Sequence, residues 1–136
     1  MSFDVFIQDI PETAATVADI PDDFRPKPIG KRSDIIGAIL KSAPGADFSK
    51  PTWGVIATDD YSIEVNIGEA DPVESFAFHV RGGFAAFELI DTILRSLSLR
   101  AFAPTDTGIF NLHDLRTAFG VWTTYRDQIA GDSIDT

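Results

Sequence analysis

Three runs of strand-forming residues lie in the middle of the chain, with only short gaps between them. They cover residues 53–58, 62–67 and 73–80 and are rich in valine, isoleucine and phenylalanine. Asp59-Asp60 and Gly68–Pro72 separate the runs, and both gaps have a length that β-hairpins use. Consecutive strands joined by such short connections pair with one another in order. We therefore predict a three-stranded antiparallel meander at the centre of the fold.

Helical patterns flank this meander. Ser33 is a good N-cap for a helix through residues 34–43. A second helix opens at Gly82-Gly83, and Asn111 caps a third. In each helix, apolar residues recur at helical spacing and predict one buried stripe. The stripes are Ile36, Ile39 and Leu40 in the first helix, Phe87, Ile90, Leu94 and Leu97 in the second, and Leu115, Phe119, Trp122, Tyr125 and Ile129 in the third.

The remaining segments complete an α+β order. Residues 3–7 alternate between apolar and other residues and predict a first strand, and residues 100–103 predict a short later one. The order β-α-βββ-α-β-α predicts an antiparallel β-sheet with two or three helices packed mainly on one face. A ferredoxin-like relative with an added strand is one version of this topology. The length predicts a single domain over residues 1–136, with a frayed tail at 131–136.

The composition excludes several classes of function. The chain has 21 acidic and 11 basic residues, a formal charge of −10, which disfavours nucleic acids and anionic lipid surfaces as partners. No cysteine is present, so disulfides, thiol catalysis and cysteine zinc sites are excluded, and the cytoplasm is the expected compartment. No segment has the apolar length of a membrane span, and the acidic N-terminal residues are not typical of a secretory signal.

The charge is arranged in blocks along the chain. Residues 1–23 and 58–80 each carry six acidic residues and no lysine or arginine, whereas residues 24–57 carry six basic residues and two acidic ones. An acidic surface attracts basic partners, although many proteins are acidic only to stay dispersed. Whether the basic segment neutralises the two acidic blocks in space decides between these interpretations. The acids are Asp4, Asp9, Glu12, Asp19, Asp22 and Asp23 in the first block, and Asp59, Asp60, Glu64, Glu69, Asp71 and Glu74 in the second.

Familiar catalytic and cofactor motifs are missing. A phosphate-binding loop ending at Gly30-Lys31 would need glycine at position 25, where the chain has arginine. Gly82-Gly83 could present helix amides to an anion, but a tight strand-to-helix turn is the favoured interpretation. The two histidines, His79 and His113, show no metal-ligand spacing. The sequence therefore predicts no catalytic residue, no cofactor and no metal, and it favours a protein that is not an enzyme.

One candidate surface follows from strand parity. Side chains alternate between the two faces of a strand, so Ile63 and Val65 share a face with Phe78. The opposite face then carries Ser62, Glu64 and Asn66 beside Ser75, Ala77, His79 and Arg81. Two registers keep this parity: one sets Glu64 opposite His79 and Ser62 opposite Arg81, and the other sets Ser62 opposite His79 and Glu64 opposite Ala77.

The candidate binding residues on this face are Glu64, Asn66, His79 and Arg81. An ordinary solvated sheet face is the competing and favoured interpretation. Trp53 and Val55 join the same face in one register of the first hairpin. An exposed tryptophan there would favour binding, since aromatic residues dominate interfaces.

A resemblance accompanies these patterns. The segments Trp53–Ile56, Ser62–Gly68, Asp71-Pro72 and Phe76–Gly83 resemble the corresponding parts of small bacterial proteins of this size, some of them similar to immunity proteins. The similarity covers roughly the middle third of the chain. It implies a bacterial source and a shared meander, and it carries over no activity and no functional residue.

Three functional hypotheses follow. The leading one is a non-enzymatic acidic module that binds a protein partner, a basic one such as a toxin domain. The second is a small enzyme or ligand-binding domain that uses Glu64, Asn66, His79 and Arg81 in a concave pocket. The third is a homodimer formed through the meander edge or the last helix.

Overall fold

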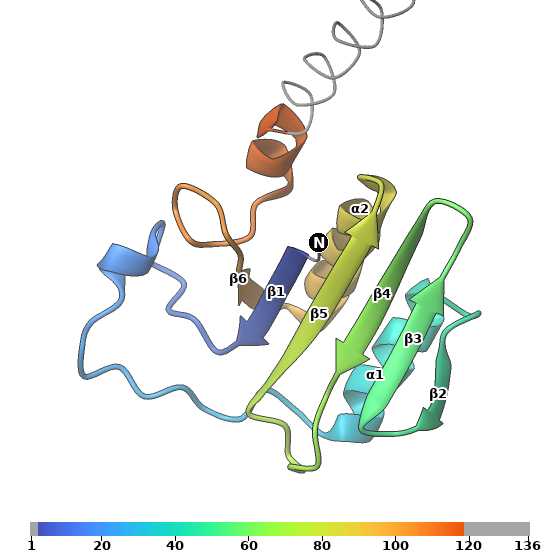
Figure 1. Cartoon of the computed structure of the whole chain (residues 1–136). Coiled ribbons are helices and arrows are strands. Elements are labelled where there is room, and N and C mark those ends of the chain that lie inside the picture. The colour runs from blue at the N-terminus through green and yellow to red at the C-terminus, as the bar shows by residue number, and fades with distance from the viewer. Residues whose placement is uncertain (1–2, 119–136) are drawn as a thin grey trace, which may run out of the picture.

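A computed structural model describes residues 3–118 of the chain. Within these residues, six strands form one antiparallel sheet in the order β2-β3-β4-β5-β1-β6 (Figure 1). The predicted α+β class with an antiparallel sheet is confirmed. The strands are β1 (Phe3–Gln8), β2 (Asp47–Lys50), β3 (Trp53–Ala57), β4 (Tyr61–Asn66), β5 (Ser75–Gly82) and β6 (Arg100–Phe102).

Two helices cover one face of this sheet. α1 (Arg32–Ser42) and α2 (Ala85–Leu97) pack against each other behind the strands (Figure 1). α2 buries Phe87, Ile90 and Leu94, as its predicted apolar stripe requires. These side chains meet the inward residues of the strands, such as Phe78 on β5, and form the main core. The hydrophobic effect therefore holds the helices to this one face.

The central meander is confirmed and is longer than predicted. β3, β4 and β5 pair in order, and β2, which the sequence did not predict, adds a fourth strand at the β3 edge. The residues of β2 are mostly polar, and three of its four residues are exposed, so they show no strand pattern. Phe48 anchors it to the core, because its ring packs directly over Gly54 of β3. The connections match a β-α-β-β-α-β ferredoxin-like fold with β2 and β3 inserted after α1.

The start of α1 differs from the prediction. Ser33 lies inside the helix, and Lys31 occupies the N-cap position without a side-chain hydrogen bond. The amide of Arg32 instead donates to Asp71 Oδ1 at 3.1 Å, and the Arg32 guanidinium donates to the carbonyl of Glu69 at 3.2 Å. A loop almost forty residues away thus supplies the acceptor that a local cap normally provides.

A long connection, residues 9–31, joins β1 to α1. Only residues 17–19 of it form a helical turn, which is the 3-10 helix η1 (Val17–Asp19). The Arg100 guanidinium holds this connection to β6, because it donates to the carbonyls of Pro11 at 2.6 Å and Ala14 at 2.7 Å. Ile10 and Ala14 are buried there in a second, smaller apolar cluster. The connection is therefore anchored, although it has little regular structure.

The predicted third helix begins as expected. Residues 112–118 are helical, Asn111 Oδ1 accepts a hydrogen bond from the Asp114 amide at 3.1 Å, and Leu115 is buried. The rest of the predicted stripe lies outside the described residues: Phe119, Trp122, Tyr125 and Ile129. No helix within residues 3–118 is long and apolar enough to cross a membrane.

Candidate functional site

The face of the sheet opposite α1 and α2, here called the open face, is not covered by any helix of residues 3–118 (Figure 1). The strand registers arrange its side chains in rows that run across the strands. We call two neighbouring rows the aromatic row and the acidic row. The aromatic row is Trp53, Asn66, Ala77, Phe6 and Phe102, and the acidic row is Asp47, Val55, Glu64, His79 and Asp4.

The aromatic row exposes large apolar side chains. Phe6 is 49% exposed and Trp53 is 37% exposed, and Val55 of the acidic row is also 37% exposed. These are three of the four large apolar side chains that residues 3–118 leave exposed. Single exposed apolar residues are common, but a group on one uncovered sheet face is typical of an interaction site.

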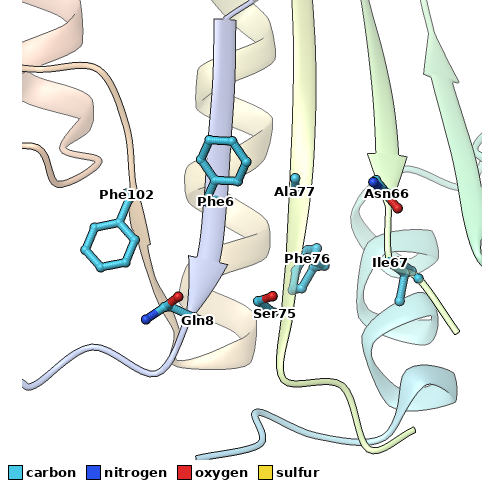
Figure 2. A pocket seen from close by; sticks show the side chains of 9 residues that line it. Phe6, Gln8, Asn66, Ile67, Ser75, Phe76, Ala77 and Phe102 are labelled. Atoms are coloured by element: carbon cyan, nitrogen blue, oxygen red, sulfur yellow. The ribbon is translucent and has the colours of Figure 1, made fainter. Parts of the chain in front are cut away.

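A groove crosses the open face at the aromatic row. Its volume is about 510 Å³, and its lining includes Phe6, Asn66, Ala77 and Phe102. Figure 2 shows the rings of Phe6 and Phe102 on one side of it and Asn66 on the other. Phe6 and Phe102 also line a neighbouring hollow of about 360 Å³ that reaches Asp4. The groove is lined by polar and apolar side chains together, and it is open to solvent along the sheet.

Beside this groove, His79 is held between two other strands. Asp4 Oδ1 of β1 lies 2.8 Å from His79 Nδ1, and a carboxylate can only accept, so the imidazole nitrogen donates. Trp53 of β3 stacks on the imidazole, with ring centroids 6.0 Å apart and planes inclined by 23°. Because β4 lies between β3 and β5, the stacked rings of Trp53 and His79 meet across β4. His79 is therefore fixed by a hydrogen bond on one side and a ring on the other.

The three carboxylates of the acidic row differ in their partners. Asp4 holds His79, and Asp47 accepts hydrogen bonds from the hydroxyl and the amide of Ser49. The Ser49 hydroxyl, followed by its amide, holds the pKa of the Asp47 carboxyl below its usual value. Glu64 is half-buried and has no hydrogen-bonding or ionic partner within residues 3–118. Of these three carboxylates, Glu64 is the one that remains available to bind a group of another molecule.

The four residues proposed from the sequence are only partly brought together. Glu64 lies directly opposite His79 and Ser62 opposite Arg81, which is the first of the two registers considered. Asn66 lines the groove in the next row. Arg81 is exposed near the end of β5, and it is not among the residues that line the groove.

The two acidic blocks of the sequence are spread in space. Asp59 and Asp60 lie in the β3–β4 hairpin, whereas Glu69, Asp71 and Glu74 lie at the opposite end of β4. Within residues 3–118, no lysine or arginine of the basic segment forms an ion pair with either block. Its contacts with them are hydrogen bonds that involve a main-chain group: the Lys27 amide donates to Asp9 Oδ2 at 3.0 Å, and the Arg32 guanidinium donates to the Glu69 carbonyl oxygen at 3.2 Å. The basic segment therefore does not pair with the blocks, but the blocks do not form one acidic patch either.

Several residues of the open face are not predicted from the sequence. Phe6 and Phe102 line both hollows, and Asp4 holds the histidine. A signal existed for Phe6, since it occupies a polar-face position of β1 between Asp4 and Gln8. A large apolar residue on the solvent side of a strand predicts a contact that the core does not explain. The pairing of β1 with β5 and β6 joins segments that are distant in the sequence. No local pattern therefore predicts that Asp4 and Phe102 lie on the open face.

The Gly82-Gly83 turn has a structural role. Gly82 has a φ of 110°, and a Cβ atom there would lie 2.5 Å from the Asp60 carbonyl oxygen. The Gly83 amide donates to that same oxygen at 3.0 Å, so it is not presented to an anion. Within residues 3–118, no three histidine, aspartate or glutamate side chains gather closely enough to hold a metal ion.

Comparisons with known proteins do not extend this description. No protein-family model, no curated protein and no solved structure matches the chain. Functional inference therefore depends on the geometry of the open face.

Proposed function

We propose that this protein is a non-enzymatic binding module that recognises a basic protein partner through the open face. The observation that carries this proposal is the exposure of Trp53 and Phe6 on a sheet face that no helix of residues 3–118 covers. Aromatic side chains bury large areas with little loss of conformational entropy, so they supply most of the binding energy in many interfaces. The groove beside Phe6 gives a partner side chain a place to insert.

The charge of the chain supports a basic partner. A formal charge of −10 attracts cationic proteins over distances of about a Debye length and raises their rate of association. The carboxylates of the acidic row lie beside the apolar residues that would form the centre of the interface. An immunity-like role, in which the partner is a toxin domain in the cytoplasm, is one form of this proposal.

A capture experiment tests the proposal. The immobilised protein is compared with the double variant Phe6→Ser/Trp53→Ser and with Val17→Ser, which removes an exposed apolar side chain that is not on the sheet. We expect the wild type and Val17→Ser to retain the same basic protein from a bacterial extract, and the double variant to lose it. Binding of the purified partner should weaken as salt is raised. Equal capture by all three proteins, or none, would overturn the proposal.

A ligand-binding or enzymatic role is the second candidate. The Asp4–His79 pair favours it, because a carboxylate on one imidazole nitrogen orients the other for proton transfer. The groove, however, has Asn66 in its lining and neither His79 nor Glu64. The discriminating variant is His79→Gln: loss of a small-molecule turnover would support this role, whereas unchanged partner capture would support the binding module.

A further inference from the structure

We propose that the open face binds an arginine side chain of its protein partner between Trp53 and Glu64, and that a neighbouring apolar side chain of the same partner segment fills the groove beside Phe6. This inference rests on the proposed function, because it names the chemistry that the same face would recognise. Its occupant is a partner segment that carries an arginine close to an apolar residue.

Glu64 supplies the negative charge for this contact. Its carboxylate lies at the centre of the acidic row, half-buried and without a partner within residues 3–118. The carboxylates at both ends of the row already accept hydrogen bonds, Asp47 from Ser49 and Asp4 from His79. A partly buried carboxylate has lost some of its hydrogen bonds from water. A guanidinium that donates two hydrogen bonds to the carboxylate replaces them.

Trp53 explains the choice of arginine rather than lysine. Its ring reaches across β4 to stack on His79, so it lies close to the β4 side chains that include Glu64. The planar guanidinium of arginine stacks on indole while its edge donates to a carboxylate, and the compact ammonium of lysine cannot do both. The exposed part of Trp53, 37% of its surface, is available for that stacking.

The distance between the two rows determines which residues of the partner segment can contact each row. Residues two apart on one strand are separated by about 7 Å, so the aromatic and acidic rows lie about 7 Å apart. An extended partner segment has the same spacing between its alternate side chains. An arginine over Glu64 therefore places the next residue but one over Asn66, which lines one edge of the groove. Its apolar side chain would have to extend sideways across β5, over Ala77, to reach Phe6 on β1.

Charge argues against two other occupants. A second copy of this chain brings another formal charge of −10, and a nucleic acid brings phosphates, so both are repelled. Two cations of this chain lie on the same face, Lys50 opposite Trp53 and Arg81 opposite Ser62. Neither forms an ion pair with Glu64. The negative charge of Glu64 thus remains available to pair with a cation of the partner.

The test is a calorimetric titration with an oligo-arginine peptide and an oligo-lysine peptide of equal length. The matched variants are Glu64→Gln and Glu88→Gln, the latter an exposed carboxylate on α2 behind the sheet. Both variants lose one negative charge, so general attraction to a polycation falls equally. Because Glu64 has no bonding partner within residues 3–118, Glu64→Gln should fold normally, and its Tm serves as the check.

We expect oligo-arginine to bind the wild type several-fold more tightly than oligo-lysine. Glu64→Gln should weaken oligo-arginine binding about tenfold, and Glu88→Gln less than about twofold. Trp53→Leu should remove the preference for arginine. Equal affinities for the two peptides, or equal effects of the two glutamine variants, would overturn the arginine site.

The two proposals can fail separately. If Phe6→Ser/Trp53→Ser loses the captured partner while Glu64→Gln binds it and oligo-arginine as the wild type does, the docking face stands and the arginine site is wrong. If oligo-arginine binding depends on Glu64 but the double variant captures the same proteins as the wild type, the site chemistry stands and the proposed function is wrong.

Discussion

The covered and open faces of the sheet come from the same strands but differ in composition and in exposure to solvent. On the covered face, Ile7, Ile63 and Phe78 are fully buried against the two helices. On the open face, the residues next to them in sequence include Phe6 and Glu64, which remain at least partly in contact with solvent. Alternation along a strand places these sets on opposite sides. The fold is thus stabilised mainly from one side, which leaves the other side free to carry a binding surface.

The difference also concerns polar groups. Within residues 3–118, no polar or charged residue is buried in the core, so the covered face is held by apolar packing alone. The open face combines rings, carboxylates and an imidazole in adjoining rows. A surface of that composition contributes little to folding, because its polar groups are as well satisfied by water. The open face can therefore vary with function at small cost to stability.

The largest expected effect tests this division directly. Phe78→Ala empties a site on the covered face where the ring is fully buried and packs edge-to-face on Phe76, with centroids 5.4 Å apart. It should lower the free energy of unfolding by about 3–5 kcal/mol. Phe6→Ala, on a ring that is 49% exposed, should lower it by about 1 kcal/mol or less. Urea unfolding followed by circular dichroism measures both. Equal losses would mean that the open face is part of the core.

A smaller effect tests how the covering helix α1 is attached. Asp71→Ala removes the acceptor for the Arg32 amide at the first turn of α1, and it should lower the free energy of unfolding by about 1 kcal/mol. Glu74→Ala is the matched control, because it removes an exposed acidic residue of the same loop that has no hydrogen bond in the described structure. Its effect should stay within about 0.5 kcal/mol. If the two variants are equally stable, the loop does not cap the helix.

The smallest effect concerns η1, which lies on neither face. The amides of Ala15, at 2.9 Å, and Thr16, at 3.0 Å, donate to Asp19 and hold the pKa of its carboxyl below the usual value of 3.8. A lowered folded pKa stabilises the protein above the unfolded pKa, and this stabilisation is lost as the pH falls through the folded value.

We therefore expect Asp19→Asn to lower the Tm slightly at neutral pH and to have the same Tm as the wild type below the folded pKa of Asp19. Thermal unfolding from pH 7 down to strongly acidic pH measures the difference. A difference that persists in acid would show that the charge of Asp19 is not its cause.

Much of the open face could be predicted from the sequence, but the strand register could not, for a physical reason. Parity alone placed Glu64, Asn66, His79 and Arg81 on one side, because alternation is a local property of each strand. Parity could not choose between two registers, since both keep the same faces buried. The structure selects the one that pairs Glu64 with His79.

Trp53 shows the same limit. Its side of the sheet depended on the register of the first hairpin, which the sequence left open. The pairing of Trp53 with Asn66 places it on the open face, where it meets His79 two strands away. A contact across an intervening strand depends on the registers of two strand pairs at once. No residue spacing in the sequence predicts such a contact.

The sequence by itself determined the α+β class, the central meander, the two covering helices and the charge of the chain. These follow from periodicity and composition, which act over a few residues or over the whole chain. Tertiary structure alone decided that β1 enters the sheet beside β5, which brings Asp4 to His79 and sets Phe6 in line with Trp53. It also decided that Asp71 caps α1 and that the acidic blocks separate. The physical reason is that strand pairing joins residues far apart in the chain, and the free energy of such pairing depends on the whole core and not on any local pattern.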